Sequence, residues 1–499
     1  MAVTPRPADH PPSGLPGTTY DVVVLGAGPT GENVADYAVR GGLTVVVVES
    51  ELVGGECSYW ACMPSKALLR PVEALAAARA VGGAEQAVTG ELDAAAVLAR
   101  RDAFTAGWQD ASQVGWLDGI GVPLVRGAGR LAGARQVDVA GNDGSTARLT
   151  ARHAVVVCTG SEAALPPVDG LADARPWTSR DATSASTAPG RLLVLGGGVV
   201  GVEMATAWSA LGSDVVLLQR GPTLLPAYEP EASALVTRSL RERGIEVRTS
   251  ARVSAVRRTD DGGVVVTLES QSGADEQLAG DELLVAAGRT PRTVDLGLET
   301  VGLTPGEPLA TDDTLQVLGA DGGWLYAAGD VTGRVLLTHQ GKYQARACGQ
   351  VVAARARGEQ PDVGAWSRFT AHADDAAVPQ VVFTDPQIAS VGLTEAAAVE
   401  RGLEIWTAEH DLAAVAGAAL VSDSYRGWAK LVVDAERTVV VGATFVGPDV
   451  AELLHSATVA IVGEVPLARL WHAVPSYPTV SEVWLRLLEQ LVGRLGWDV

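Results

Sequence analysis

Cys57 and Cys62 are separated by four residues in the segment GGECSYWACMPSKALL. A glycine turn precedes the pair, and the Ala- and Leu-rich residues 61–80 predict a helix that begins at the two cysteines. One helical turn between the sulfurs is compatible with a disulfide bond. A helix N-terminus carries partial positive charge, which favours a thiolate. The pair therefore predicts a disulfide that opens and closes, with at least one acidified thiol.

Two other interpretations of the pair are a couple of buried, inert cysteines and half of a zinc site. Zinc ligands usually have a shorter spacing, and no second cluster of Cys and His lies nearby, so no metal site is predicted. The whole chain has only four cysteines, the other two being Cys158 and Cys348. Four are too few for a disulfide-stapled secreted scaffold, which favours a reducing cytoplasm.

Length and charge narrow the class of protein. A chain of 499 residues predicts about three domains of roughly 150 residues each. The net charge of −21 argues against nucleic acid and anionic membranes as partners. Residues 1–17 lack the apolar core of a signal peptide and predict a disordered tail, and no apolar run reaches the length of a membrane span.

A glycine-rich turn follows the first apolar strand, which is predicted over residues 21–25. A helical stretch and a second strand at residues 44–48, ending in Glu49, complete a βαβ dinucleotide fingerprint. The turn brings backbone close to a pyrophosphate at a helix N-terminus, and Glu49 is placed to bind an adenosine ribose hydroxyl. The three glycines of this turn are Gly26, Gly28 and Gly31.

The same pattern recurs with strands predicted at residues 191–195 and 214–218. Its glycines are Gly196, Gly198 and Gly201. Two dinucleotide turns predict two nucleotides bound at once, naturally FAD and a nicotinamide nucleotide. The alternative is that one turn serves only as a packing device. At the second site the ribose acid is replaced by Gln219, followed by Arg220, so a 2′-phosphate is not repelled and NADPH is favoured over NADH. Arg220 is otherwise an ordinary solvated charge.

The order of motifs closely resembles the flavoprotein pyridine nucleotide–disulfide oxidoreductases, which include glutathione reductase, dihydrolipoamide dehydrogenase and mercuric reductase. The motifs are GxGxxG, CxxxxCxPSK, a second GxGxxG and AGD at 328–330, and the likeness covers residues 18–490. It implies an α/β fold with two Rossmann-like dinucleotide-binding domains, a C-terminal α+β dimerisation domain, and a homodimer. The implied ranges are 18–165 for FAD, 190–291 for NAD(P)H, 292–374 for the return to the FAD-binding central domain, and 375–499 for dimerisation.

The resemblance also implies roles for single residues. Cys62 matches the cysteine that contacts the flavin as the charge-transfer thiolate, and Cys57 matches the interchange thiol. Lys66 matches a lysine near the flavin, where its charge favours the anionic reduced ring, and Glu203 matches the acid paired with it. The alternative for both is ordinary surface charge. Further cofactor-contacting positions implied by the matched motifs are Thr159, Gly160, Gly288 and Asp330.

One position departs from the thiol-producing relatives, which carry a His-Pro-Thr motif followed by a glutamate. Here the motif reads Tyr477-Pro-Thr, with Glu482 in register. Histidine titrates near 6.5 and tyrosine near 10, so tyrosine is worse as a base by roughly 5 kcal/mol at neutral pH. Losing a general acid–base costs about 10²–10⁴-fold in rate. His472 is an alternative acid–base, against a purely structural role.

We therefore predict an FAD-dependent NAD(P)H oxidoreductase that passes electrons through the Cys57–Cys62 disulfide to a quinone, a metal ion or another small electrophile. One alternative is a disulfide reductase of dihydrolipoamide dehydrogenase type. Another is a non-catalytic flavoprotein redox sensor or scaffold, against which the intact cysteine pair, Lys66 and Glu203 argue. The aromatic insert Tyr59–Trp60 is expected either to narrow access to Cys57 or to pack against the flavin domain.

Overall fold

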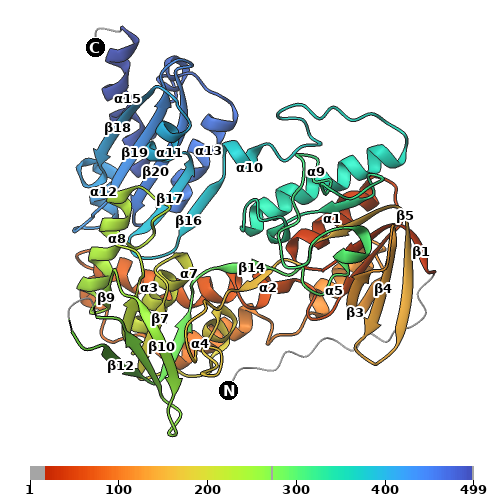
Figure 1. Ribbon diagram of the computed structural model, residues 1–499. Helices are drawn as coiled ribbons and strands as arrows, with labels where there is room; N and C mark the ends of the chain where they lie inside the picture. The colour runs from red at the N-terminus through yellow and green to blue at the C-terminus, as the bar shows by residue number, and fades with distance from the viewer. Residues whose placement is uncertain (1–16, 271–272, 497–499) are drawn as a thin grey trace. The chain divides into compact units, whose positions relative to one another are not determined.

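The computed structural model describes residues 17–270 and 273–496, and these form two compact units (Figure 1). Unit 1 comprises Met1–Pro64, Arg101–Ala164 and Arg289–Asp374, and unit 2 comprises Ser65–Arg100, Leu165–Gly288 and Asp375–Val499. The tail predicted at residues 1–17 lies, apart from Gly17, outside the described residues. No helix of the described chain has the length and apolarity that crossing a membrane requires.

Unit 1 is built on a six-stranded sheet whose parallel strand β1 lies between β2 and β5. Its strands are β1 (Thr19–Leu25), β2 (Val45–Glu49), β3 (Leu124–Leu131), β4 (Gln136–Gly141), β5 (Thr146–Val157) and β15 (Leu325–Ala327). Both faces of β1 are buried, as its unbroken apolar run predicts for a parallel strand. Val22 and Val24 pack with the helices α1 (Pro29–Arg40) and α9 (Thr338–Ala356), while Val23 and Leu25 enter the opposite core.

Unit 2 contains a second parallel sheet, in the order β13-β7-β8-β9. Its strands are β7 (Arg191–Leu195), β8 (Asp214–Leu218), β9 (Glu246–Arg248) and β13 (Glu282–Val285). The strands predicted at 191–195 and 214–218 are confirmed at both ends. The helices α7 (Val199–Ala210) and α8 (Pro230–Glu242) share one apolar core with β7 and β8 of this sheet. A separate antiparallel sheet is formed by β10 (Val253–Arg258), β11 (Val264–Leu268) and β12 (Glu276–Gly280).

The C-terminal part of unit 2 is a five-stranded antiparallel sheet in the order β16-β17-β20-β19-β18. Its strands are β16 (Pro379–Val382), β17 (Gln387–Gly392), β18 (Ile405–Asp411), β19 (Trp428–Asp434) and β20 (Val439–Gly447). The helices α13 (Leu454–Val462) and α15 (Val483–Val492) share one apolar core with it, in which Phe445 and Trp484 contact each other. The predicted fold class is confirmed: an α/β fold with two Rossmann-like sheets, followed by a C-terminal α+β part.

The helix predicted to carry both cysteines is two helices, which corrects the sequence-based expectation. Cys57 lies in α2 (Gly55–Tyr59), whereas Cys62 is the first residue of α3 (Cys62–Arg79). The break has a physical cause in the Tyr59 carbonyl. In a continuous helix it would accept from the amide four residues later, but it accepts from the indole Nε1 of Trp108 at 3.1 Å. Each cysteine therefore sits on its own helix.

Candidate functional site

The first glycine turn, between β1 and α1, leaves room for a phosphate. At Gly26 (φ +96°) a Cβ atom would lie 2.5 Å from the Cys158 carbonyl oxygen, and at Gly31 it would lie 1.9 Å from that of Gly26. Gly28 caps α1, and a Cβ there would meet nothing nearer than the Cα of Gly55, at 4.0 Å. The helix N-terminus is thus open at the point where a pyrophosphate binds in this type of turn.

Glu49 ends β2 with its carboxylate fixed beside the same turn. Oε2 accepts from the Ala27 amide and Oε1 from the Glu51 amide, both at 2.7 Å. Burial raises the pKa of Glu49, and the two amides oppose that shift. Burial also raises the pKa of Glu32, on α1, to about 8. The carboxylate of Glu49 has the place that ribose recognition requires, and these residues fit an adenine dinucleotide.

Asp330 is held at the end of a second chain of contacts in unit 1. Its Oδ2 accepts from the Ser161 hydroxyl at 2.6 Å, and that hydroxyl accepts from Arg289 Nε at 2.7 Å. Burial raises the pKa of Asp330, while Ser161 and Arg289 lower it. Thr159 donates to the Arg292 carbonyl at 2.9 Å, and Gly160 next to it has φ +72°. The two segments predicted to contact the flavin are therefore joined directly.

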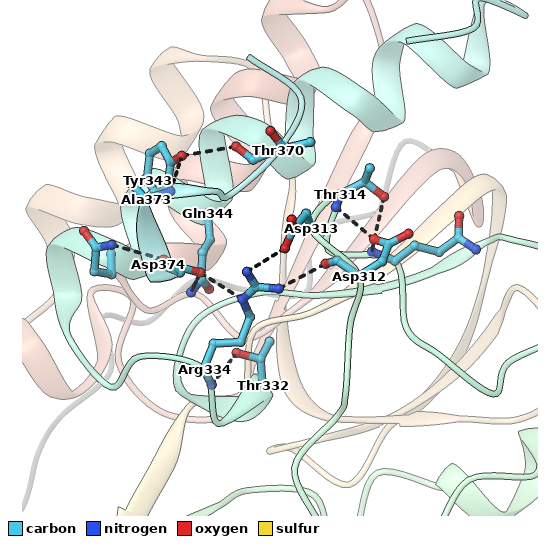
Figure 2. A network of polar contacts seen from close by, with 12 residues as sticks. Asp312, Asp313, Thr314, Thr332, Arg334, Tyr343, Gln344, Thr370, Ala373 and Asp374 are labelled. Atoms are coloured by element: carbon cyan, nitrogen blue, oxygen red, sulfur yellow. Dashed lines mark hydrogen bonds and ion pairs between the residues drawn. The ribbon is translucent and has the colours of Figure 1, made fainter. Parts of the chain in front are cut away.

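Sequence reasoning missed the support for this turn, which Figure 2 shows around Asp374 and Arg334. The Gly329 amide donates to Gln344 Oε1 at 2.6 Å, and Gln344 Nε2 donates to Asp374 at 2.9 Å. Arg334 Nε donates to the same carboxylate at 3.0 Å, and Gln340 Nε2 donates to it at 3.1 Å. Burial raises the pKa of Asp374. No local motif marks these residues, because they come from a loop, from α9 and from the short helix α10 (Ala373–Ala376).

The two cysteines are both present as half-buried thiols. The Cys62 sulfur lies 3.2 Å from the hydroxyl of Thr338, which is the first residue of α9. Cys62 is also the first residue of α3, so the N-termini of two long helices meet at this sulfur and favour a negative charge there. The Cys57 thiol hydrogen-bonds to Cys62, and that bond together with burial raises the pKa of Cys57. The geometry therefore favours Cys62 as the thiolate, with Cys57 as the thiol that keeps its proton.

The aromatic insert between the cysteines packs inward. Tyr59 and Trp60 are buried, with their ring centroids 5.7 Å apart, in a cluster with Leu52 and Trp108. The Tyr59 hydroxyl donates to Gln113 at 3.1 Å. Of the two expected roles, packing is the one that the structure supports.

The second glycine turn repeats the first with one chemical change. The Gly197 amide donates to Gln219 Oε1 at 3.0 Å, the bond that Ala27 makes to Glu49 at the first turn. A neutral amide therefore replaces a carboxylate at the ribose position. Arg220 is exposed and makes no side-chain hydrogen bond or ion pair within residues 17–270 and 273–496.

The backbone of this second turn is as constrained as that of the first. A Cβ on Gly201 would lie 1.8 Å from the Gly196 oxygen, whereas a Cβ on Gly198 would meet nothing within 4 Å. Gly288, after β13, has φ +138°. The N-terminus of α7 is therefore open in the same way as that of α1, as a nucleotide phosphate requires.

Lys66 and Glu203 are brought together as predicted. Lys66 Nζ donates to Glu203 Oε2 at 2.7 Å, and Oε1 of the same buried carboxylate accepts from the Phe383 amide at 3.0 Å. The Lys66 ammonium also lies 4.7 Å from the centroid of the Phe383 ring. Phe383 was missed from the sequence, since nothing local marks a residue that meets α3 and α7 from the C-terminal layer.

Replacing Glu203 by alanine is expected to lower the free energy of unfolding by about 2 kcal/mol, because it leaves Lys66 and the Phe383 amide without their acceptor. The value is below the range for a fully buried pair, since the Lys66 side chain is 36% exposed. Urea denaturation of Glu203→Ala, Lys66→Met and the double variant measures the coupling. A double variant that loses the sum of the two single losses would show that the pair contributes nothing.

The C-terminal acid–base segment is exposed, apart from its glutamate. Tyr477 is 76% exposed and His472 is also exposed, and neither side chain makes a hydrogen bond or ion pair to any described residue. Glu482 is buried, and its Oε1 accepts from Arg486 at 2.6 Å. Its Oε2 is buried without a hydrogen-bond partner among the described residues. The glutamate is in place, but no side chain from the Tyr477 position uses its second oxygen.

Comparisons with known proteins cover nearly the whole chain. Residues 20–358 match the family model described as pyridine nucleotide-disulphide oxidoreductase, and residues 378–487 match the dimerisation domain of the same family. The dihydrolipoyl dehydrogenase of Thermus scotoductus is 33% identical, with 95% of this chain and 97% of that protein covered. A mercuric reductase of Streptomyces lividans is 36% identical, with coverages of 95% and 96%.

Solved structures show the same architecture. LpdA from Mycobacterium tuberculosis is 27% identical, with a TM-score of 0.79, covering 95% of this chain and 100% of that one. The HOCl-induced flavoprotein disulfide reductase RclA from Escherichia coli, in its Cu(II) complex, is 23% identical with the same TM-score and coverages, and supports the fold alone.

Proposed function

Because the chain belongs to the pyridine nucleotide-disulphide oxidoreductase family of FAD-dependent enzymes, we propose that it oxidises NAD(P)H and delivers the electrons through the Cys57–Cys62 pair to a quinone, a metal ion or another small electrophile. One observation carries this choice of acceptor. The dithiol is complete, whereas the acid–base position is an exposed Tyr477 and the oxygen of Glu482 that would orient a histidine is unused.

FAD, when bound, accepts a hydride from the nicotinamide nucleotide and passes the electron pair on to the disulfide. The turn at Gly28, the carboxylate of Glu49 and Asp330 would hold it. The turn at Gly198 would hold the nicotinamide nucleotide, with NADPH favoured because Gln219 does not repel a 2′-phosphate and Arg220 is free to pair with one.

The dithiol step balances with two electrons and one proton: the Cys57–Cys62 bond breaks, Cys62 becomes a thiolate and Cys57 a thiol. The positions of the sulfurs support this assignment. The Cys62 sulfur lies at two helix N-termini and beside the Thr338 hydroxyl, which favour a thiolate. The pKa of Cys57, in contrast, is raised by its bond to Cys62 and by burial. Lys66, fixed by Glu203 and Phe383, would supply the positive charge expected beside the flavin.

The nature of the acceptor follows from where protons are needed. Reducing a disulfide substrate releases a thiolate, which leaves faster when a neighbouring acid protonates it. A quinone takes its protons from water, and a metal ion bound by thiolates needs none. A tyrosine, which is a poorer acid–base than histidine at neutral pH, suits quinones and metal ions better than disulfides.

A disulfide reductase of dihydrolipoamide dehydrogenase type is the second candidate. It is favoured by the dihydrolipoyl dehydrogenases that are 33% identical over nearly the full length, and by the retained Glu482.

The match to a dimerisation domain at residues 378–487 supports a homodimer, to which Tyr477 and Val474, exposed by 76% and 86%, would contribute. The assignment of residues 18–165, 190–291, 292–374 and 375–499 to separate functions stays a prediction.

Stopped-flow reduction by NADPH and by NADH, followed by a panel of acceptors, tests the proposal. We expect rapid bleaching of the flavin, a long-wavelength thiolate absorbance at two electrons, and faster turnover with quinones or metal ions than with lipoyl or glutathione disulfides. Failure of both nucleotides to bleach the flavin would overturn every enzymatic interpretation, and preferred turnover of a disulfide would favour the second candidate.

A further inference from the structure

A cleft of about 450 Å³ lies within unit 2, apart from the residues to which the proposed chemistry assigns a role. Its volume falls in the range of small-molecule sites, roughly 300–1,000 Å³. The walls come from α3, α8 and loops of the five-stranded sheet, which supply Thr384–Gln387 and Ser422 among other residues. No part of the proposed electron transfer uses this cleft.

Two helices each present one face to the cleft. The residues of α3 that line it are Arg70, Glu73, Ala76, Ala77 and Arg79, followed by Ala80 directly after the helix end, and each lies three or four positions from another of them. The residues of α8 do the same: Leu235, Arg238, Ser239 and Glu242, followed by Arg243. Such spacing places side chains on one helical face. The three alanines are small, so the volume between the faces stays open.

Arginine dominates the lining of the cleft. It contains five arginines, namely Arg70, Arg79, Arg238, Arg243 and Arg426, and four acids, namely Glu73, Glu242, Asp385 and Asp449. Three of the acids are already paired, because Arg70 contacts Glu73 at 2.8 Å, Arg426 contacts Glu242 at 2.8 Å and Arg243 contacts Asp385. Five arginines against four acids give the lining a formal charge of +1, in a chain whose net charge is −21, and Arg79 is paired with Glu91, outside the lining, at 3.0 Å.

Arg238 differs from the other arginines of this lining because its guanidinium has no partner among the described residues. It makes no hydrogen bond, ion pair or ring contact within residues 17–270 and 273–496, whereas the other four have partners. A guanidinium carries five N–H donors in a fixed fork that matches carboxylate and phosphate oxygens. The paired acids also hold three neighbouring guanidinium groups in place, which lowers the ordering cost of binding.

We propose that this cleft binds a small polyanion, a molecule bearing phosphate or several carboxylate groups, with Arg238 as its principal contact. The site is independent of the electron acceptor and of the choice between NADPH and NADH. A ligand bound there contacts α3, the helix that begins at Cys62. It also contacts α8, which packs in one core with β7 and α7, the strand and the helix on either side of the second glycine turn.

Isothermal titration of the FAD-loaded enzyme with sodium pyrophosphate and with sodium citrate tests the proposal. Saturating NADP⁺ and fixed ionic strength keep the nucleotide sites occupied and the screening constant. Arg238→Ala removes the unpaired guanidinium, Ala77→Leu fills part of the volume, and Arg401→Ala, at an exposed arginine outside the cleft, is the matched control.

We expect Arg238→Ala to weaken binding about tenfold to a hundredfold, Ala77→Leu to weaken it as well, and Arg401→Ala to leave it unchanged. Binding of pyrophosphate but not citrate would identify a phosphorylated ligand, and the reverse a polycarboxylate. Absence of binding by both probes would overturn the proposal, as would equal affinities for Arg238→Ala and Arg401→Ala.

Discussion

Replacing Cys57 by serine is expected to reduce turnover of disulfide substrates by roughly 10⁴-fold or more, as removal of a nucleophile does in other enzymes. The same variant is expected to lower NAD(P)H-dependent quinone reduction as well, because the proposed route to a quinone passes through the same cysteine pair. The reason is the division of roles between the sulfurs. In the proposed division, Cys57 meets the substrate, whereas the Cys62 sulfur lies at two helix N-termini and beside the Thr338 hydroxyl, which stabilise a thiolate.

Steady-state assays with a quinone, a disulfide and a metal ion on one preparation measure these losses. A metal ion held by both sulfurs should lose turnover in Cys57→Ser, since one of its two thiolate ligands is gone. Cys348→Ala, at a core position of unit 1, serves as the control for general damage to the fold. If quinone turnover stays at the wild-type rate while disulfide turnover is lost, the flavin alone serves quinones, and the proposed route to quinones through Cys57 is wrong.

The parts of this protein that the sequence predicted well are those fixed by short-range patterns. The strands β7 and β8 and both glycine turns follow from apolar runs and from glycines spaced within a single βαβ unit. Lys66 and Glu203 meet as the family resemblance implies. The strands and turns lie within single motifs, where spacing along the chain determines what they contact, whereas the Lys66–Glu203 pair, 137 positions apart, was implied by the resemblance alone.

The parts that were missed depend on residues far apart in the chain. The indole of Trp108 donates to the Tyr59 carbonyl, 49 positions earlier in the chain, at the residue where α2 ends. No helix propensity near the cysteines predicts that bond. Gln344 links the Gly329 amide to Asp374 in the same way. Phe383 reaches Glu203 across 180 positions. The raised pKa of Cys57 has a near neighbour as its first cause, the bond to Cys62, and burial as its second, and burial is the part that spacing along the chain does not give.

Replacing Tyr477 by histidine is expected to raise disulfide turnover by about 10²-fold or more, the usual contribution of a general acid–base. The structure makes this a specific expectation, because Glu482 Oε2 is buried and unpaired among the described residues, while Oε1 is already fixed by Arg486. A buried acceptor without a donor is costly. An imidazole N–H that reaches it would therefore be oriented as well as stabilised.

The gain should depend on that oxygen and on the charge of the imidazole. Tyr477→His is expected to add a titration above about 6.5 to the pH profile of disulfide turnover, because a carboxylate beside an imidazole raises the pKa of the imidazole, and Tyr477→His combined with Glu482→Gln should lose most of the gain. Tyr477→Phe is the matched control, and quinone turnover should stay unchanged in all three variants. A histidine variant no faster than Tyr477→Phe would mean that the acid–base position does not limit disulfide reduction. The preference for other acceptors would then need a different cause, with access to Cys57 the first candidate.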